Sequence, residues 1–473
     1  MDAKVTGIAV TPAGDVYATG TAIADSLRVG GITQDLANAG YAVWAARLNS
    51  AGVCQWLRTV DVRGAAPRIA LDPSTGGVVV ADAYQGQPTF GTTTLPAVNT
   101  GTGRSALFVA RLSAAGQWTA VASSTGSPGV ASNLALAVGV NGQVAVGGRE
   151  LSGSMTFGTL STAVPASNNA GFVIAQLSPA NQWQWAIANG SSFDSEAFRL
   201  AYTAAGSLWV AGRATLGTVV GATTISSPLT SIPLGYGYHF LGQLSAGGQW
   251  TLTQQLPLST AYVVAFSAFV VDGSGNAVVL EKLGSIGAGP AQLTVGNQTI
   301  TAPAAGNQPF AAALSPGGQW RYIATTPLPA VAFGLEVADA TLNDTNLYIT
   351  GTLQGGVVFG NTTLVGSDNG STTGFRGSDA FLAKLTNATA LATKPASPTD
   401  QLAFFPNPAH AQVVLSPAVP EATSATLFDA QGREVRRQRI PAHATVTTLD
   451  LTGLTPGLYV VRCGTASGKL VVE

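Results

Sequence analysis

Charged side chains are scarce in this chain, so the positions where they recur are the first place to look for chemistry. Only 10% of the 473 residues are Asp, Glu, Lys or Arg, against about 25% in an average soluble protein. Several follow short β-branched runs at similar points of successive segments: Asp82, Arg149, Glu150, Arg213, Glu281 and Lys282. These residues are candidates for a polar binding ring at one rim of the fold. Solvated strand ends are the more common explanation for charges at such positions.

Two of these residues could carry out acid–base chemistry together. Glycosidases place a pair of carboxylates across the bond that they cleave, and Glu150 with Glu281 offers such a pair. No Ser/His/Asp arrangement, HExxH motif or phosphate-binding glycine loop accompanies them. His239, between Tyr238 and Phe240, is more typical of a strand residue than of a catalytic base. We therefore predict no catalytic residues.

Metal and cofactor sites are not indicated either. The segment "VDGSGNAV" from Val271 is similar to a calcium loop but lacks the terminal Glu and further ligands. Cys54 and Cys463 are separated by almost the whole chain and form neither a disulfide framework nor a metal motif. We expect free, buried thiols, no metal and no cofactor.

Overall charge and hydropathy narrow the classes of partner. The net charge is −1, which gives no electrostatic reason to expect nucleic acid or an anionic membrane as a partner. Hydrophobic residues make up 46% of the chain, but no apolar run reaches about 18 residues. We therefore expect a large core and no membrane-spanning helix.

A repeated phrase indicates which elements must position the charged residues. "RLSAAGQW", ending at Trp118, returns as copies ending at Trp183, Trp250 and Trp320, with a looser copy ending at Trp56. The leucines of the phrase are 64 to 71 residues apart: Leu48, Leu112, Leu177, Leu244, Leu314 and Leu385. Markers of the types "GDVYATG" and "FGTTTL" keep the same order in all six copies. A steady period of this kind indicates a repeat architecture.

Each copy is predicted to form four short strands. The leucine ends the third strand, and the tryptophan starts the outermost strand, where its ring fills the gap between neighbouring sheets. The strands do not alternate cleanly between apolar and polar residues, which indicates burial on both faces. A four-stranded antiparallel sheet in six copies is typical of a β-propeller. We predict an all-β protein with a propeller of six four-stranded blades over residues 1–392, or seven blades if the chain start is truncated.

The repeats resemble the SBBP-type β-propeller repeat family, with the best match between Tyr348 and Leu385. The resemblance implies an architecture and is nearly silent on activity. Two departures from it concern the ends. The sixth copy has "KLTNATALATK" where a tryptophan strand is expected, and no strand that would close the ring is apparent.

Residues 393–473 differ from the repeats in composition and hydrophobic pattern. Residues 393–400 form a Pro/Ser/Thr linker. Clean alternation in "ATLFD" and "LYVVRC" then predicts a small Ig-like β-sandwich over residues 401–473. The tail also holds short motifs around Pro406, Asn407 and Pro408, around Gly432 in "DAQGREV", around Gly457 and Tyr459 in "LTPGLYVV", and around Lys469 in "GKLVVE". In this order and spacing, the motifs closely resemble the C-terminal sorting domain of the type IX secretion system of Bacteroidetes-type bacteria.

The resemblance of the tail implies export across the outer membrane, the secretion machinery as a partner, and a secreted or outer-surface location. The start "MDAKVTGIAV" has no signal-peptide pattern, so we expect a truncated start. The leading hypothesis is an exported, non-enzymatic binding or display protein whose ligand is a glycan or a protein. The alternative is an exported carbohydrate-active hydrolase or lyase with its site on the rim.

Overall fold

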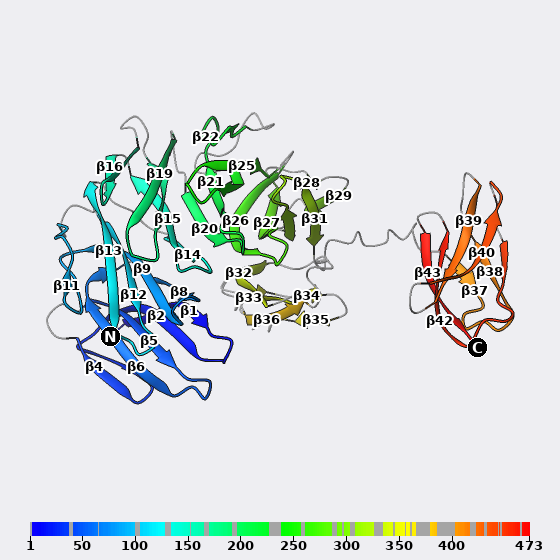
Figure 1. Ribbon diagram of the computed structural model, residues 1–473, viewed down its shortest axis with the longest axis horizontal. Coiled ribbons are helices and arrows are strands. Elements are labelled where there is room, and N and C mark those ends of the chain that lie inside the picture. Colours follow the sequence, from blue (N-terminus) through cyan, green and yellow to red (C-terminus); the bar gives the residue numbers. More distant parts are fainter. Residues whose placement is uncertain are drawn as a thin grey trace, which may run out of the picture. The chain divides into compact units, whose positions relative to one another are not determined.

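The computed structural model of the protein is all-β (Figure 1). The chain divides into two compact units, Met1–Leu391 and Ala392–Glu473. The structure describes residues 2–36, 41–64, 66–99, 105–127, 134–151, 153–164, 170–191, 196–226, 238–256, 261–285, 291–295, 298–302, 308–325, 334–343, 346–354, 356–359, 362–365, 379–385, 403–416, 422–429, 433–442, 444, 447–463 and 466–473. Within these ranges, no helix has the length and apolar character needed to cross a membrane.

Six antiparallel sheets follow one another along the described part of the first unit, and each takes its main strands from one repeat. The first sheet consists of β1 (Asp2–Val10), β2 (Val16–Ile23), β5 (Ala42–Leu48) and β6 (Cys54–Asp61). The second consists of β7 (Arg63–Gly64), β8 (Arg68–Asp72), β9 (Gly77–Gln85), β12 (Ala106–Leu112) and β13 (Trp118–Ser127). The third consists of β14 (Ala135–Val138), β15 (Val144–Leu151), β18 (Ala170–Leu177) and β19 (Trp183–Ser191). The fourth sheet consists of β20 (Glu196–Tyr202), β21 (Leu208–Ala214), β24 (Tyr238–Leu244) and β25 (Trp250–Gln255). The fifth consists of β26 (Ala261–Val271), β27 (Ala277–Ser285), β30 (Gln308–Leu314) and β31 (Trp320–Thr325). The sixth consists of β32 (Gly334–Asn343), β33 (Asn346–Gln354) and β36 (Asp379–Leu385). A fourth strand of the sixth sheet would lie after Leu385, where the next residues are outside the described ranges.

The connection between the second and third strands of every repeat contains a small hairpin, which the prediction of four strands per copy did not include. The hairpins are β3 (Ser26–Val29) with β4 (Ile32–Asp35), β10 (Thr89–Phe90) with β11 (Thr93–Thr94), β16 (Gly153–Phe157) with β17 (Leu160–Val164), β22 (Val219–Val220) with β23 (Thr223–Thr224), β28 (Ala291–Val295) with β29 (Gln298–Ala302), and β34 (Gly356–Phe359) with β35 (Thr362–Val365). In the second repeat, Phe90 pairs with Thr93, and Gly91 at φ 61° supplies the left-handed turn between them.

Burial on both faces follows from how the sheets stack. All seven residues of β12 and all seven of β24 are buried. Along β27, Ala277 and Val279 pack into the core shared with the fourth sheet, whereas Val278 and Leu280 pack toward the sixth. Alternate residues of one strand thus serve two different cores. This explains why these strands lack a polar face.

Most residues of the repeated phrase have a structural role. Leu112 is the last residue of β12. The Ser113 hydroxyl accepts a hydrogen bond from the Gln117 N–H at 3.1 Å, while the Gly116 N–H donates to the Ser113 carbonyl at 2.9 Å. Trp118 then opens β13, and its half-buried ring packs edge-on against Phe90 at a centroid distance of 5.0 Å. The Ser–Gln bond recurs at Ser178, Ser245 and Ser315.

Trp56 is not the counterpart of the other phrase tryptophans. Cys54 is the residue of β6 that pairs with the phrase leucine Leu48, and Trp56 lies opposite Arg47. The same register position in the third repeat belongs to Trp185, not to Trp183. The looser phrase of the first repeat is two residues longer between leucine and tryptophan, which moves its tryptophan to a different position on the outer strand.

Side-chain donors of one repeat bind acceptors of the next. The Trp56 indole donates to the Ala114 carbonyl at 3.0 Å, and the Trp185 indole donates to the Ala246 carbonyl at 2.9 Å. Trp209 on β21 likewise donates to the Gly275 carbonyl at 2.9 Å. In each case the acceptor lies in a turn of the following repeat, so these bonds run in one direction along the chain.

Arg111 makes the most extensive of these connections. Its guanidinium donates to the Asp72 carboxylate at 2.8 Å within the second repeat. It also donates to the Gly142 and Ser178 carbonyls of the third repeat at 2.8 and 3.2 Å. The side chains of Arg111 and Asp72 are only 9% and 3% exposed. Burial outweighs the attraction of Asp72 and lowers the pKa of Arg111.

The second unit consists of two antiparallel sheets around one core. The strands are β37 (Ala403–Phe405), β38 (Gln412–Ser416) and β41 (Thr447–Asp450) in one sheet, and β40 (Glu434–Ile440), β39 (Thr423–Phe428), β42 (Gly457–Cys463) and β43 (Ala466–Val472) in the other. Val413, Leu427 and Leu470 belong to the shared core. Cys463 is buried in this unit and Cys54 in the first, and both thiols are free.

Candidate functional site

The charged residues predicted to share a rim position occupy successive positions of the second strands. Asp82 and Glu281 lie four residues after Val78 and Ala277, the residues that pair with the phrase leucines of their sheets. Arg149, Arg213 and Lys282 lie five residues after the equivalent residues, and Glu150 lies six after. Successive strand residues point to opposite faces. These side chains therefore do not form one ring at a single register.

Burial also separates three of these residues from solvent. Asp82 and Glu281 are each 1% exposed, and Lys282 is 7% exposed. The Asp82 carboxylate accepts hydrogen bonds from the backbone N–H groups of Ala83 and Ala66 at 2.8 and 3.3 Å. Arg149 and Arg213 are half-buried, and the side chain of Glu150 lies outside the described residues. The interpretation of these charges as solvated strand ends is therefore wrong for Asp82, Glu281 and Lys282.

The structure brings His239 and Glu281 together, a contact that the sequence analysis missed. His239 lies opposite Arg213 on the face of the fourth sheet that packs against the fifth. Its Nδ1 is 3.1 Å from Oε2 of Glu281, and the two side chains are 4% and 0% exposed. The pair is sealed between two sheets and presents no carboxylate oxygen to a substrate.

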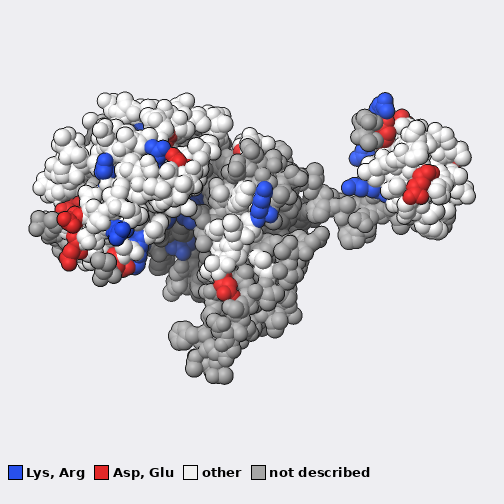
Figure 2. Space-filling model, turned by 90° about the horizontal axis from the view of Figure 1, so that it is seen from below, with Lys and Arg blue, Asp and Glu red and all other residues white. Residues whose placement is uncertain are grey.

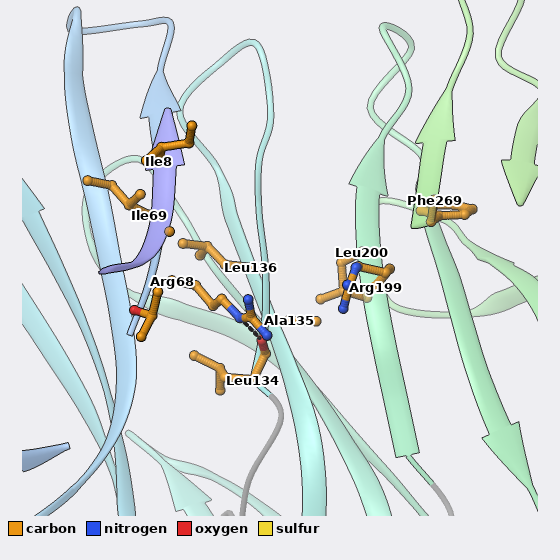
Figure 3. A pocket seen from close by; sticks show the side chains of 11 residues that line it. Ile8, Arg68, Ile69, Leu134, Ala135, Leu136, Arg199, Leu200 and Phe269 are labelled. Atoms are coloured by element: carbon orange, nitrogen blue, oxygen red, sulfur yellow. Dashed lines mark hydrogen bonds between the residues drawn. The ribbon is translucent and has the colours of Figure 1, made fainter. Parts of the chain in front are cut away.

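A cavity lies where the first strands of the repeats converge. The strands β1, β8, β14, β20, β26 and β32 contact one another in succession. Residues on or directly beside the first five of them line one cavity of about 200 Å³, which we call the central cavity (Figure 3). Ile8, Arg68, Leu136, Arg199, Leu200 and Phe269 are among its lining residues. Ile8 is 63% exposed, so the cavity is open to solvent on the side of β1.

Two arginines give the central cavity its charge. Arg68 on β8 lies opposite Ala81, and Arg199 on β20 lies opposite Ala211, at the same register position of their sheets. Arg68 Nε donates to the Leu134 carbonyl at 3.0 Å (Figure 3). None of the described lining residues is acidic. Asp339 occupies the corresponding backbone position on β32, and its side chain lies outside the described residues.

Sequence reasoning did not single out Arg68 and Arg199. Both stand in first strands, "RIAL" and "RLAY", while attention went to the ends of the second strands. An alignment of the copies on their first strands would have shown arginine at one position in the second and fourth repeats. No group of three or more His, Cys, Asp and Glu side chains close enough to bind a metal occurs among the residues that the structure describes.

The surface beyond the cavity is sparsely charged. On the face shown in Figure 2, the described surface carries a few basic and acidic side chains among mostly uncharged residues. Ion pairs offset some of them, as at Asp15 with Arg47, whose carboxylate and guanidinium are 2.6 Å apart. With a net charge of −1 for the whole chain, electrostatic steering of a highly charged polymer is not indicated.

The predicted sorting residues hold the second unit together. The Asn407 amide donates to the Lys469 carbonyl at 2.9 Å, and its oxygen accepts from the Val471 N–H at 2.8 Å. The Tyr459 hydroxyl donates to the Thr455 carbonyl at 2.7 Å, and Gly457 opens β42 opposite Val472. The motif residue Gly432 lies outside the described residues, and Pro406 and Pro408 flank Asn407. The motifs thus join the start of this unit to its last strand.

The chain is similar to several solved structures at low sequence identity. A Hadza microbial sialidase, Hz136, shows 12% identity and a TM-score of 0.35, with 74% of this chain and 63% of the sialidase covered. This chain therefore spans less than two thirds of the sialidase. The polysaccharide lyase Uly1 shows 11% identity and a TM-score of 0.35, with 94% and 89% covered. An ulvan lyase of family PL25 shows 9% identity and a TM-score of 0.37, with 93% of both chains covered. At these values, the likenesses carry no conclusion about activity.

The comparison with protein families concerns the tail. No curated protein matches the chain. Residues 403–473 match the family model of the secretion system C-terminal sorting domain. The match covers the strands β37 to β43 and the Asn407 contacts described above. A tail of this family implies secretion of the protein that carries it. Residues 403–473 of this chain are a secretion system C-terminal sorting domain.

Proposed function

We propose that this protein is a non-enzymatic binding or display protein that the type IX machinery exports to the bacterial surface or the medium. In this proposal, residues 1–392 form a propeller of six SBBP-type blades, and residues 401–473 form an Ig-like sorting module. The match of residues 403–473 to the sorting-domain family carries the proposal. The machinery would act on the tail, remove it near the linker, and release the propeller or attach it to the cell.

The binding role draws support from the first unit. The inner strands of five repeats line a cavity that is open to solvent, and pockets at such convergence points are common ligand sites. The predicted rim residues remain candidates for a glycan or protein contact only where they are not fully buried, as at Arg149 and Arg213.

The rival function is that of an exported carbohydrate-active hydrolase or lyase with its site on the rim. That function needs two carboxylates that reach the substrate. Glu281 is 1% exposed and contacts His239, which weighs against it as one member of the pair. Turnover of a polysaccharide by the full chain, abolished by Glu150→Gln or Glu281→Gln, would favour the enzyme.

The export step is tested in a bacterium that has a type IX system. A signal peptide is fused before Met1, and the full chain is compared with a chain that ends at Asp400. We expect the full chain in the medium or on the cell surface and the shortened chain in the periplasm. Equal export of both chains would contradict the proposal. A full chain carrying Arg28→Gln, an exposed change in the first unit, serves as the control and should be exported normally.

A further inference from the structure

The central cavity combines cationic donors with apolar walls. Arg68 and Arg199 contribute guanidinium groups from β8 and β20. Ile8, Leu136, Leu200 and Phe269 contribute apolar side chains from four strands (Figure 3). A guanidinium is planar, remains charged and binds a carboxylate through two parallel N–H donors. A cavity with this lining is suited to a ligand that has one anionic group and a compact body.

The donors of Arg68 are set up for such a ligand. Its Nε is committed to the Leu134 carbonyl at 3.0 Å, which fixes the guanidinium against β14. Within the described ranges, no hydrogen bond or ion pair engages its Nη nitrogens, and the side chain is half-buried. The orientation is therefore set by one backbone contact, while two nitrogens keep donors for a ligand. Preorganisation of this kind reduces the entropic cost of binding.

The size of the cavity limits the body of the ligand. Sites for drug-sized ligands have volumes of roughly 300–1,000 Å³, and the central cavity has about 200 Å³. A single ring with a carboxylate fits this limit, whereas a folded peptide does not. A longer polymer would have to enter by its end.

We propose that the central cavity is a binding site for a compact carboxylate. The Nη donors of Arg68 hold the carboxylate, Arg199 adds positive charge to the same lining, and the body of the ligand packs against the apolar wall. This inference rests on the proposed binding function and names a ligand class for it. The two arginines come from repeats that are not adjacent, so the site exists only when the second, third and fourth sheets are assembled. A single blade cannot provide it.

The test is calorimetric titration of the full chain at fixed ionic strength with two pairs of ligands. Benzoate is compared with benzamide, and glucuronate with glucose, so that each pair differs chiefly in the anionic group. We expect saturable binding of at least one carboxylate and no binding of its neutral partner. The pair that binds identifies the body as apolar or hydroxylated. Failure of both carboxylates to bind would overturn the proposal.

Variants assign the binding to the cavity. Arg68→Gln is expected to weaken binding about tenfold to a hundredfold, as expected for loss of a charge-assisted hydrogen bond. Arg199→Gln is expected to weaken binding less, because it removes only a positive charge from the lining. Arg28→Gln is the matched control, because exposed Arg28 also donates through Nε to a backbone carbonyl, that of Gly30 at 3.0 Å. Unchanged affinity in both cavity variants would overturn the proposal.

Two further measurements keep the result interpretable. Thermal midpoints are recorded for every variant, and Arg68→Lys retains the charge if Arg68→Gln does not fold. Arg68→Lys is then expected to bind more weakly than the wild type but measurably. The export experiment is independent of this site. An exported chain that binds no carboxylate would overturn the ligand class and leave the proposed export function intact.

Discussion

Arg111 shows how much a single residue can contribute to the joining of two repeats. It pairs with Asp72 and donates to two carbonyls of the third repeat, and both side chains are nearly fully buried. Arg111→Met would leave the Asp72 carboxylate buried without its cation. We expect the free energy of unfolding to fall by about 3–5 kcal/mol.

The control for Arg111→Met is Lys4→Met in the same unit. Lys4 pairs with Asp2 at 3.4 Å, and both side chains are more than half exposed. An exposed pair contributes about 0–1 kcal/mol. Urea denaturation of both variants checks the difference, and a similar loss in both would show that Arg111 does not join the repeats as described.

Tyr202 makes a pH-dependent contribution to stability. Burial raises the pKa of its phenol to about 12, although the hydrogen bond from Gln176 at 2.7 Å favours the ionised form. The unfolded chain has a tyrosine pKa of about 10. The stabilisation is therefore fully present below about pH 10 and is lost as the pH rises toward about 12.

The size of this effect follows from the shift of about two pKa units, which corresponds to about 2–3 kcal/mol. Tyr202→Phe removes the ionisable group. We expect the unfolding free energy of the wild type to fall more steeply than that of Tyr202→Phe between about pH 10 and pH 12. Parallel curves would contradict the burial of this phenol.

At the scale of elements, the phrase turns of the second and fourth repeats receive a tryptophan of the preceding repeat. Gly248 has φ 75°, and a Cβ added to it would stand 2.6 Å from Cδ2 of Trp185. Gly52 occupies the related turn of the first repeat at φ 78°, with no atom within 4 Å of an added Cβ. Both glycines have a left-handed backbone conformation, but only at Gly248 does a tryptophan ring pack where a Cβ atom would stand.

Gly248→Ala and Gly52→Ala therefore introduce the same kind of backbone strain, but only Gly248→Ala also brings a Cβ atom into contact with the Trp185 ring. We expect Gly248→Ala to destabilise the first unit by about 1–3 kcal/mol more than Gly52→Ala, as for overpacking of a core. Thermal unfolding measures the difference. An equal effect of the two substitutions would show that the Trp185 ring does not occupy this turn.

Strands could be predicted from the sequence where the same residue type recurs at the same structural position of every repeat. The phrase leucines end third strands because this end recurs at one place in every sheet. Trp56 shows the limit of this reasoning, because a two-residue longer phrase leaves the residue type unchanged and moves the register. The hairpin strands β10 and β11 have two residues each, too few to show a period.

The candidate site was harder to predict than the elements. The scarcity of charge directed attention to Asp82 and Glu281, and the structure buries both. Arg68 and Arg199 come together in the cavity only because first strands of separate repeats surround the same space. Sequence periodicity assigns a residue to a strand and a face, but it does not show which distant strands enclose a cavity.

For the whole molecule, each of the two units has its own core. We expect scanning calorimetry of the full chain to show two transitions. Deletion of residues 403–473 should remove one transition and leave the midpoint of the other unchanged. A shifted midpoint in the shortened chain would show that the stability of the first unit depends on the tail.

The direction of the bonds between repeats has a consequence for biosynthesis. Trp56, Trp185 and Trp209 each find their acceptor in a turn that the ribosome makes later. A nascent chain that ends after the first, third or fourth repeat therefore holds an indole donor without this acceptor until the next repeat emerges. Domains generally fold in the order of their synthesis, and here each new segment completes the one before it. A translational pause before the accepting turn has emerged would prolong the time for which the indole lacks its acceptor, whereas a pause after that turn has emerged would not.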